Sequence, residues 1–139
     1  MSKIFLATHG HMASGMASSL EILYGNLENL TVFDAYVDGE EKSVEDAVDD
    51  FFTKCDDNET KLLISDMFGG SVNNTLTLYS NKENTFVLTG ITLSLLLELI
   101  CHCDENFTEN QLNELIENSR LLTKLIKVDN TVVVEEDFF

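Results

Sequence analysis

The sequence predicts one α/β domain whose mostly parallel sheet is covered by helices on both faces. Short apolar runs alternate with segments of helical period along the chain, which is typical of strand–helix–strand units. The chain has 139 residues and no proline, repeat or low-complexity linker, so we expect a single domain over residues 1–139. Because such units are joined by right-handed crossovers, four of them favour the strand order 2-1-3-4 of flavodoxin-like sheets.

Four apolar runs predict the strands of this sheet. Each is bounded by polar residues or glycine, and a strand buried on both faces of a parallel sheet has a nearly continuous apolar sequence. In chain order the runs are residues 3–7, 30–36, 61–65 and 85–89. A further short run at residues 131–134 follows two helices rather than one, so the pattern leaves its pairing open.

The segments between the strands carry apolar residues three or four positions apart, which predicts helices. In chain order these are residues 12–23, 44–55, 71–79, 92–102 and 108 to about 124. Ser43 with Asp46 forms an approximate capping box for the second helix, and Thr108 with Gln111 forms one for the last. Residues 92–102 are apolar almost all round, so we expect that helix to be buried on more than one side or to lie in a subunit interface.

The charge of the chain excludes several classes of partner. Eight basic and 25 acidic residues give a net charge of −17, whereas nucleic acid and anionic membranes require clustered lysine and arginine. The N-terminus has no signal-peptide pattern, and the longest apolar stretch, residues 91–101, is about half the length that spans a bilayer. We therefore expect a soluble, cytoplasmic protein that binds no nucleic acid.

The three cysteines predict neither a disulfide framework nor a metal site. Their odd number and irregular spacing are typical of a reducing compartment. Cys101, His102 and Cys103 are consecutive, but positions two apart on a helix point to different faces, and no second pair of ligands follows. We expect no metal and no cofactor.

A histidine and an aspartate are expected at the same crevice of the sheet. Open α/β sheets bind ligands beyond the carboxyl ends of their strands, where the winding reverses, and in the order 2-1-3-4 that point lies between the first and third strands. His9 directly follows the first strand and Asp66 directly follows the third. The two together indicate a functional site more specifically than either alone, and His11 is expected to flank it.

This pair suits a nucleophilic imidazole. A carboxylate that accepts the Nδ1 proton fixes the tautomer, leaves Nε2 free to attack, and stabilises the cation that forms when Nε2 binds an electrophile. The helix that follows is opened by Gly69, Gly70 and Ser71, whose backbone N–H groups and hydroxyl are expected to receive an anion such as phosphate. A plainer interpretation stays open, in which His9 hydrogen-bonds only its loop and the glycines only form a tight turn.

Two stretches of the chain resemble a known family. IFLATHGHMASGM at residues 4–16 and LLISDMFGGSVNN at residues 62–74 are similar to the IIA components of the mannose-family sugar phosphotransferase system (PTS). The resemblance covers essentially the whole chain in segment order and length. Its most specific parts are a strand followed by T-H-G-x-x-A-S-G and a strand followed by S-D-x-F-G-G-S.

The resemblance implies a phosphotransferase that carries phosphate for bacterial sugar uptake. In that family the histidine matching His9 accepts a phosphoryl group on Nε2 from the phosphocarrier HPr and passes it to the IIB component, which serves the membrane components IIC and IID. The aspartate matching Asp66 hydrogen-bonds that histidine, and the serine matching Ser71 lies near the phosphoryl group. The family also forms homodimers that exchange the final strand, which would account for residues 131–134.

Two positions depart from the family pattern. Val72 stands where many members have proline, and Met67 stands where some relatives have threonine, so the details of the phosphate site are expected to differ. The sequence covers one IIA-like domain, so the IIB partner is expected to be a separate polypeptide. Two alternatives remain: the phosphotransfer subunit of a dihydroxyacetone kinase, and a non-catalytic flavodoxin-like module that binds a small anion. The sequence does not specify the sugar.

Overall fold

The computed structural model describes residues 1–128, which form four strands and five helices. The strands are β1 (Ser2–His9), β2 (Leu30–Ala35), β3 (Thr60–Ser65) and β4 (Thr85–Leu88). The helices are α1 (Met12–Leu23), α2 (Val44–Thr53), α3 (Ser71–Thr77), α4 (Leu93–Cys101) and α5 (Glu109–Arg120). Each element overlaps a strand or helix that the sequence predicts.

The strands form a parallel sheet in the order β2-β1-β3-β4, which confirms the predicted order. His9 at the end of β1 lies opposite Ala35 at the end of β2, and Ala7 lies opposite Ser65 at the end of β3. The carboxyl ends of these three strands therefore meet at one edge of the sheet. The turns that leave this edge carry the residues of the expected site.

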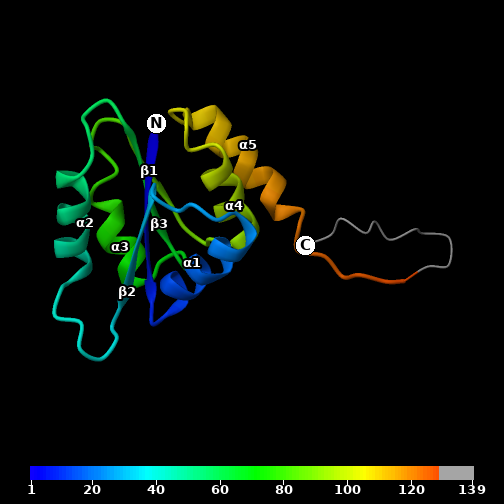
Figure 1. Cartoon of the computed structure of the whole chain (residues 1–139), viewed down its shortest axis with the longest axis horizontal. Coiled ribbons are helices and arrows are strands. Elements are labelled where there is room, and N and C mark those ends of the chain that lie inside the picture. The colour runs from blue at the N-terminus through cyan, green and yellow to red at the C-terminus, as the bar shows by residue number, and fades with distance from the viewer. Residues whose placement is uncertain (129–139) are drawn as a thin grey trace.

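Helices cover both faces of the sheet, with α2 and α3 on one face and α1, α4 and α5 on the other (Figure 1). The side chains of β1 alternate between the two cores. Ile4 and Leu6 pack with α1 and α4, whereas Phe5 and Ala7 pack with α2 and α3. All four are fully buried, and burial of one Ile, Leu or Phe side chain contributes about 1.5–3 kcal/mol. Packing on both faces fixes the central strands and thereby the position of their carboxyl ends.

The predicted helix starts and the burial of α4 are confirmed. Both capping boxes are present, each with its two reciprocal hydrogen bonds, at the starts of α2 and α5. Helix α4 begins after Thr92, whose hydroxyl accepts a hydrogen bond from the backbone N–H of Leu95. It packs against the sheet, α1 and α5, so it is buried on more than one side without a second chain.

Several predicted boundaries differ from the structure by one to four residues, and two of the differences have a clear physical reason. Helix α5 ends at Arg120 rather than near residue 124, and the apolar residues that follow are exposed, because a terminal helical turn without a packing surface gains little stability. Strand β2 ends at Ala35 rather than residue 36, because Tyr36 has a left-handed φ of 62° that interrupts the extended backbone. The predicted strand at residues 131–134 lies outside the described residues. Within residues 1–128 no helix has the length and apolar character needed to cross a membrane.

Candidate functional site

His9 and Asp66, predicted to share a crevice, are in direct contact at the carboxyl edge of the sheet. His9 is the last residue of β1, and Asp66 directly follows β3. Oδ2 of Asp66 accepts a hydrogen bond from the backbone N–H of His9 at 2.9 Å and lies 2.9 Å from Nδ1 of the same residue. A carboxylate in this place favours the tautomer that carries its proton on Nδ1, and it leaves Nε2 as the nitrogen with a free lone pair.

The environment of Asp66 keeps its carboxyl group ionised. Burial on its own raises the pKa of Asp66, but hydrogen bonds from the backbone and side chain of His9 outweigh burial, so the pKa lies below its ordinary value. The Asp66 side chain is 11% exposed, whereas the His9 side chain is 42% exposed. The pair therefore combines a sheltered anion with an imidazole that another molecule can reach.

Ser71 and Tyr36 lie on the Nε2 side of the His9 ring. Oγ of Ser71, the first residue of α3, lies 3.4 Å from Nε2. The phenol oxygen of Tyr36 lies 2.8 Å from that Oγ, and the Tyr36 and His9 ring centroids are 5.3 Å apart. Sequence reasoning missed Tyr36, although its place directly after β2, at the same sheet edge as His9, was a usable signal.

The two glycines before α3 have different places in the site. A Cβ atom on Gly70 would lie 3.4 Å from Cε1 of His9 and 3.2 Å from Cγ of Met67, so Gly70 lets the helix start approach the imidazole closely. Its N–H donates to the carbonyl of Met67 at 3.4 Å. Gly69 has a φ of +78°, and within the described residues a Cβ atom there would meet nothing within 4 Å, so Gly69 shapes the turn rather than contacting the ring.

A second imidazole–carboxylate pair lies beside the first. Nδ1 of His11 is 3.0 Å from Oδ2 of Asp34, a residue of β2 that sequence reasoning did not single out. Asp34 also accepts hydrogen bonds from the backbone N–H and the hydroxyl of Ser14, in the first turn of α1. Burial raises the pKa of Asp34, but these hydrogen bonds outweigh it and lower the pKa overall. Asp34 therefore stabilises the start of α1.

Exposed apolar side chains occupy the same edge of the sheet as His9. Met67 and Phe68 follow Asp66, Met12 begins α1, and Tyr36 follows β2; all four are exposed. Exposed apolar groups that gather near a reactive side chain are typical of surfaces that bind another protein. Met67 supplies one of these apolar groups next to His9 and Gly70.

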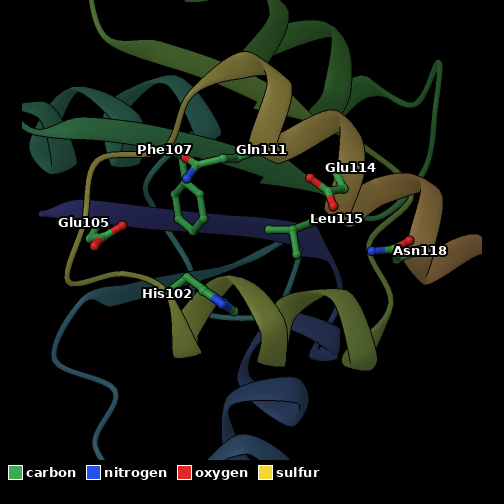
Figure 2. Close-up of a pocket in the computed structure, with 7 residues that line it drawn as sticks. All are labelled: His102, Glu105, Phe107, Gln111, Glu114, Leu115 and Asn118. Carbon is green, nitrogen blue, oxygen red and sulfur yellow. The ribbon is translucent and has the colours of Figure 1, made fainter.

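A pocket at the other end of the domain shares none of these residues. It lies between the end of α4 and α5, where Phe107 and Leu115 extend between the two helices (Figure 2). Glu105 and Glu114 at its rim disfavour an anion. Within residues 1–128 no group of three or more His, Cys, Asp and Glu side chains is placed to hold a metal ion. His102, also at this pocket, places Nδ1 2.8 Å from the carbonyl of Glu98.

Comparison with known proteins places the chain in a family. The family model EIIA-man, PTS system fructose IIA component, matches residues 3–119. A Klebsiella pneumoniae protein assigned to a phosphoenolpyruvate-dependent sugar PTS permease is 26% identical, with a TM-score of 0.79 over 89% of this chain and 90% of that one. The PTS component EIIA of Streptococcus agalactiae is 25% identical, with a TM-score of 0.72 over 87% of this chain and 94% of that one.

A third solved structure agrees in fold alone. The mannose/sorbose-specific IIA subunit of Enterococcus faecalis is 17% identical, with a TM-score of 0.79 over 94% of this chain and 98% of that one. No curated protein matches the chain significantly. The family model spans most of the sequence, and the solved relatives share the sheet that carries His9 and Asp66. The chain therefore belongs to the EIIA-man family of PTS IIA components.

Proposed function

We propose that this protein carries a phosphoryl group on Nε2 of His9, accepting it from phospho-HPr and passing it to a IIB component that serves a sugar permease. The proposal rests on the groups that contact the two nitrogen atoms of the His9 ring. The Asp66 carboxylate holds Nδ1 at 2.9 Å, Ser71 Oγ lies 3.4 Å from Nε2, and the His9 side chain is 42% exposed. Membership of a family of IIA components supports this assignment.

The proposed transfer conserves atoms, protons and charge. The Nε2 lone pair of neutral His9 attacks the phosphorus atom of the donor phosphohistidine. The phosphorus–nitrogen bond of the donor breaks, and its electron pair returns to the donor imidazole. The proton on Nδ1 of His9 stays in place, so the phosphorylated ring is a cation that the Asp66 carboxylate stabilises. Transfer to the IIB component repeats these steps in the opposite sense, with His9 as the leaving group.

The surface around His9 suits a protein donor better than a small molecule. The exposed Met67 and Phe68 supply apolar contacts, and the loop that contains Asp38 and Gly39 borders the same edge. The net charge of −17 favours encounter with a partner that presents a basic face. We also propose a homodimer, as the family resemblance implies, which sedimentation of the full chain tests directly.

Phosphate labelling tests the proposal. Incubation with radiolabelled phosphoenolpyruvate, Enzyme I and HPr should place acid-labile phosphate on the wild-type protein. The His9→Ala variant should take up none. His11→Gln should be labelled within about threefold of wild type, because no hydrogen bond among residues 1–128 reaches Nε2 of His11. Absence of label on wild type, while HPr is phosphorylated, would overturn the function. Full labelling of the His9→Ala variant would overturn the assignment of His9 as the phosphoryl acceptor.

The identity of the acceptor separates the proposed function from its nearest relative. Phosphate on His9 should move to a sugar-specific IIB component when the two are mixed. Delivery to a dihydroxyacetone kinase subunit, with none to IIB, would assign the protein to that enzyme instead. A non-catalytic anion-binding module would show no covalent label at all.

A further inference from the structure

We propose that Tyr36 is a positioning residue for phosphoryl transfer: its phenol donates a hydrogen bond to Ser71 Oγ and so directs the Ser71 hydroxyl proton at Nε2 of His9. This inference rests on the proposed function of His9 and assigns a role to a residue that neither the sequence pattern nor the family match singled out. Three neighbouring side chains take part: His9 at the end of β1, Tyr36 directly after β2, and Ser71 at the start of α3.

The three polar atoms are arranged in sequence. The phenol oxygen of Tyr36 is 2.8 Å from Oγ of Ser71, which is an ordinary length for a hydrogen bond between hydroxyl groups. The same Oγ is 3.4 Å from Nε2 of His9, which is long for a hydrogen bond. The Tyr36–Ser71 bond thus holds the serine in place before the phosphoryl group is present.

One assignment of donors lets both contacts be hydrogen bonds with the protons available. In the neutral His9 ring the single N–H is on Nδ1, which faces Asp66, so Nε2 accepts. Ser71 has one hydroxyl proton, and a proton directed at Nε2 is not available for Tyr36. The phenol must then be the donor to Ser71. A hydroxyl that accepts one hydrogen bond becomes a stronger donor in the next, so Tyr36 strengthens the donor that faces the reacting nitrogen.

The Tyr36–Ser71 hydrogen bond also positions the serine during and after transfer. The Nε2 lone pair must be free when it attacks phosphorus, so the Ser71 proton turns from Nε2 to an oxygen of the phosphoryl group as that group arrives. Tyr36 still donates its phenol proton to Ser71 Oγ, so the Ser71 hydroxyl proton stays directed at the phosphoryl oxygen and not at the phenol. The protein has a net charge of −17, and a donor fixed next to the phosphoryl group offsets part of this unfavourable field.

The backbone at Tyr36 indicates that its position is imposed by the fold. Its φ of 62° is left-handed, a conformation that is strained for residues other than glycine. The preceding Ala35 lies opposite His9 in the sheet, and its carbonyl accepts a hydrogen bond from the N–H of Gly10 at 2.9 Å. The turn after β1 and the end of β2 are therefore tied together, and Tyr36 is held with its ring 5.3 Å from that of His9.

Nitrogen NMR of the His9 ring tests this arrangement without any phosphate. Ser71→Ala should move the Nε2 resonance toward that of a nitrogen without a hydrogen bond. Tyr36→Phe keeps the ring and removes only the hydroxyl, so it should move the resonance in the same direction by a smaller amount. In a Ser71→Ala background, Tyr36→Phe should cause no further shift, because its effect passes through the serine.

The rate of phosphoryl transfer supplies a second readout. Tyr36→Phe should slow transfer from phospho-HPr about threefold to tenfold, which corresponds to the loss of one hydrogen bond to a positioned group. The same substitution should have no effect on the rate once Ser71 is alanine. Tyr24→Phe is the matched control, since Tyr24 is also an exposed tyrosine but lies at the end of α1.

Three results would overturn the role of Tyr36. The first is an unchanged Nε2 resonance in Tyr36→Phe, and the second is an unchanged rate of phosphoryl transfer in that variant. The third is an effect of Tyr36→Phe that is equally large in the wild-type and the Ser71→Ala backgrounds. A failure of the proposed function is distinguishable from all three. It appears as absence of label on the wild-type protein, while the NMR comparison still decides whether Tyr36 acts on His9 through Ser71.

Discussion

Two imidazole–carboxylate pairs lie at the same edge of the sheet, and their contacts are nearly identical. Nδ1 of His9 is 2.9 Å from Asp66, and Nδ1 of His11 is 3.0 Å from Asp34. The other partners of the two carboxylates differ. Asp66 binds His9 through both its ring and its backbone, whereas Asp34 is shared with the hydroxyl and backbone of Ser14 at the start of α1. One carboxylate orients a ring, and the other stabilises a helix start.

The opposite side of each ring shows the larger difference. Nε2 of His9 faces Ser71, and Gly70 lies close to the ring. The hydrogen bonds found among residues 1–128 include none to Nε2 of His11, whose side chain is 80% exposed. A histidine–aspartate pair is therefore not by itself evidence for a nucleophile. The groups that surround the attacking nitrogen distinguish the two sites, and the following substitutions test that distinction.

The carboxylates should differ most in their effect on transfer. Asp66→Asn removes the charge that selects the His9 tautomer and stabilises the phosphorylated ring, so transfer from phospho-HPr should slow about 10²- to 10⁴-fold. Asp34→Asn should change the rate less than about threefold and lower the free energy of unfolding by about 1 kcal/mol, because it weakens the start of α1. Stopped-flow transfer and urea unfolding measure the two effects. Equal losses of rate would remove the distinction between the pairs.

A methyl group at the ring edge should have an intermediate effect. In Gly70→Ala the new Cβ would lie 3.2 Å from Cγ of Met67 and 3.4 Å from Cε1 of His9. The Met67 side chain must then shift while the new methyl group packs against the edge of the ring, so transfer should slow about threefold to tenfold. Gly15→Ala is the control within α1, where no atom of residues 1–128 outside the helix backbone and the neighbouring residues lies within 4 Å of the new Cβ. It should stabilise the fold by about 0.5–1 kcal/mol and leave the rate within about twofold. A transfer rate in Gly70→Ala equal to that of wild type would mean that the close approach is irrelevant.

The acid limb of the stability curve should give the smallest effect. The pKa values of Asp66 and Asp34 are both lowered in the folded protein. Their stabilisation is complete above the unfolded-state pKa of about 3.9 and is lost as the pH falls through the lower folded-state values. Urea midpoints measured from pH 7 to pH 3 should therefore fall more steeply for wild type than for Asp34→Asn or Asp66→Asn. Parallel curves below pH 4 would show that these hydrogen bonds add no pH-dependent stability.

Much of the fold was predictable because its signals are local. Nearly continuous apolar runs specify strands buried on both faces, and apolar residues at helical spacing specify the helices between them. The capping boxes at Ser43 and Thr108 were correct because such a cap needs only residues three positions apart. The end of α5 was not predictable in this way. The apolar period continues past Arg120, but nothing within residues 1–128 packs over the apolar side chains that follow. The helix therefore ends at Arg120 for a reason that the local sequence does not show.

The sequence alone determined the order of the sheet and the meeting of His9 with Asp66. Parallel strands bring their carboxyl ends to one edge whatever the side chains, so two residues that end adjacent strands must be neighbours. The tertiary structure alone decided that Tyr36 reaches Ser71, that Asp34 holds the start of α1, and that Gly70 touches the imidazole. Those contacts depend on strand register, on one left-handed residue and on side-chain rotamers, and each of these is set by packing between segments far apart in the chain.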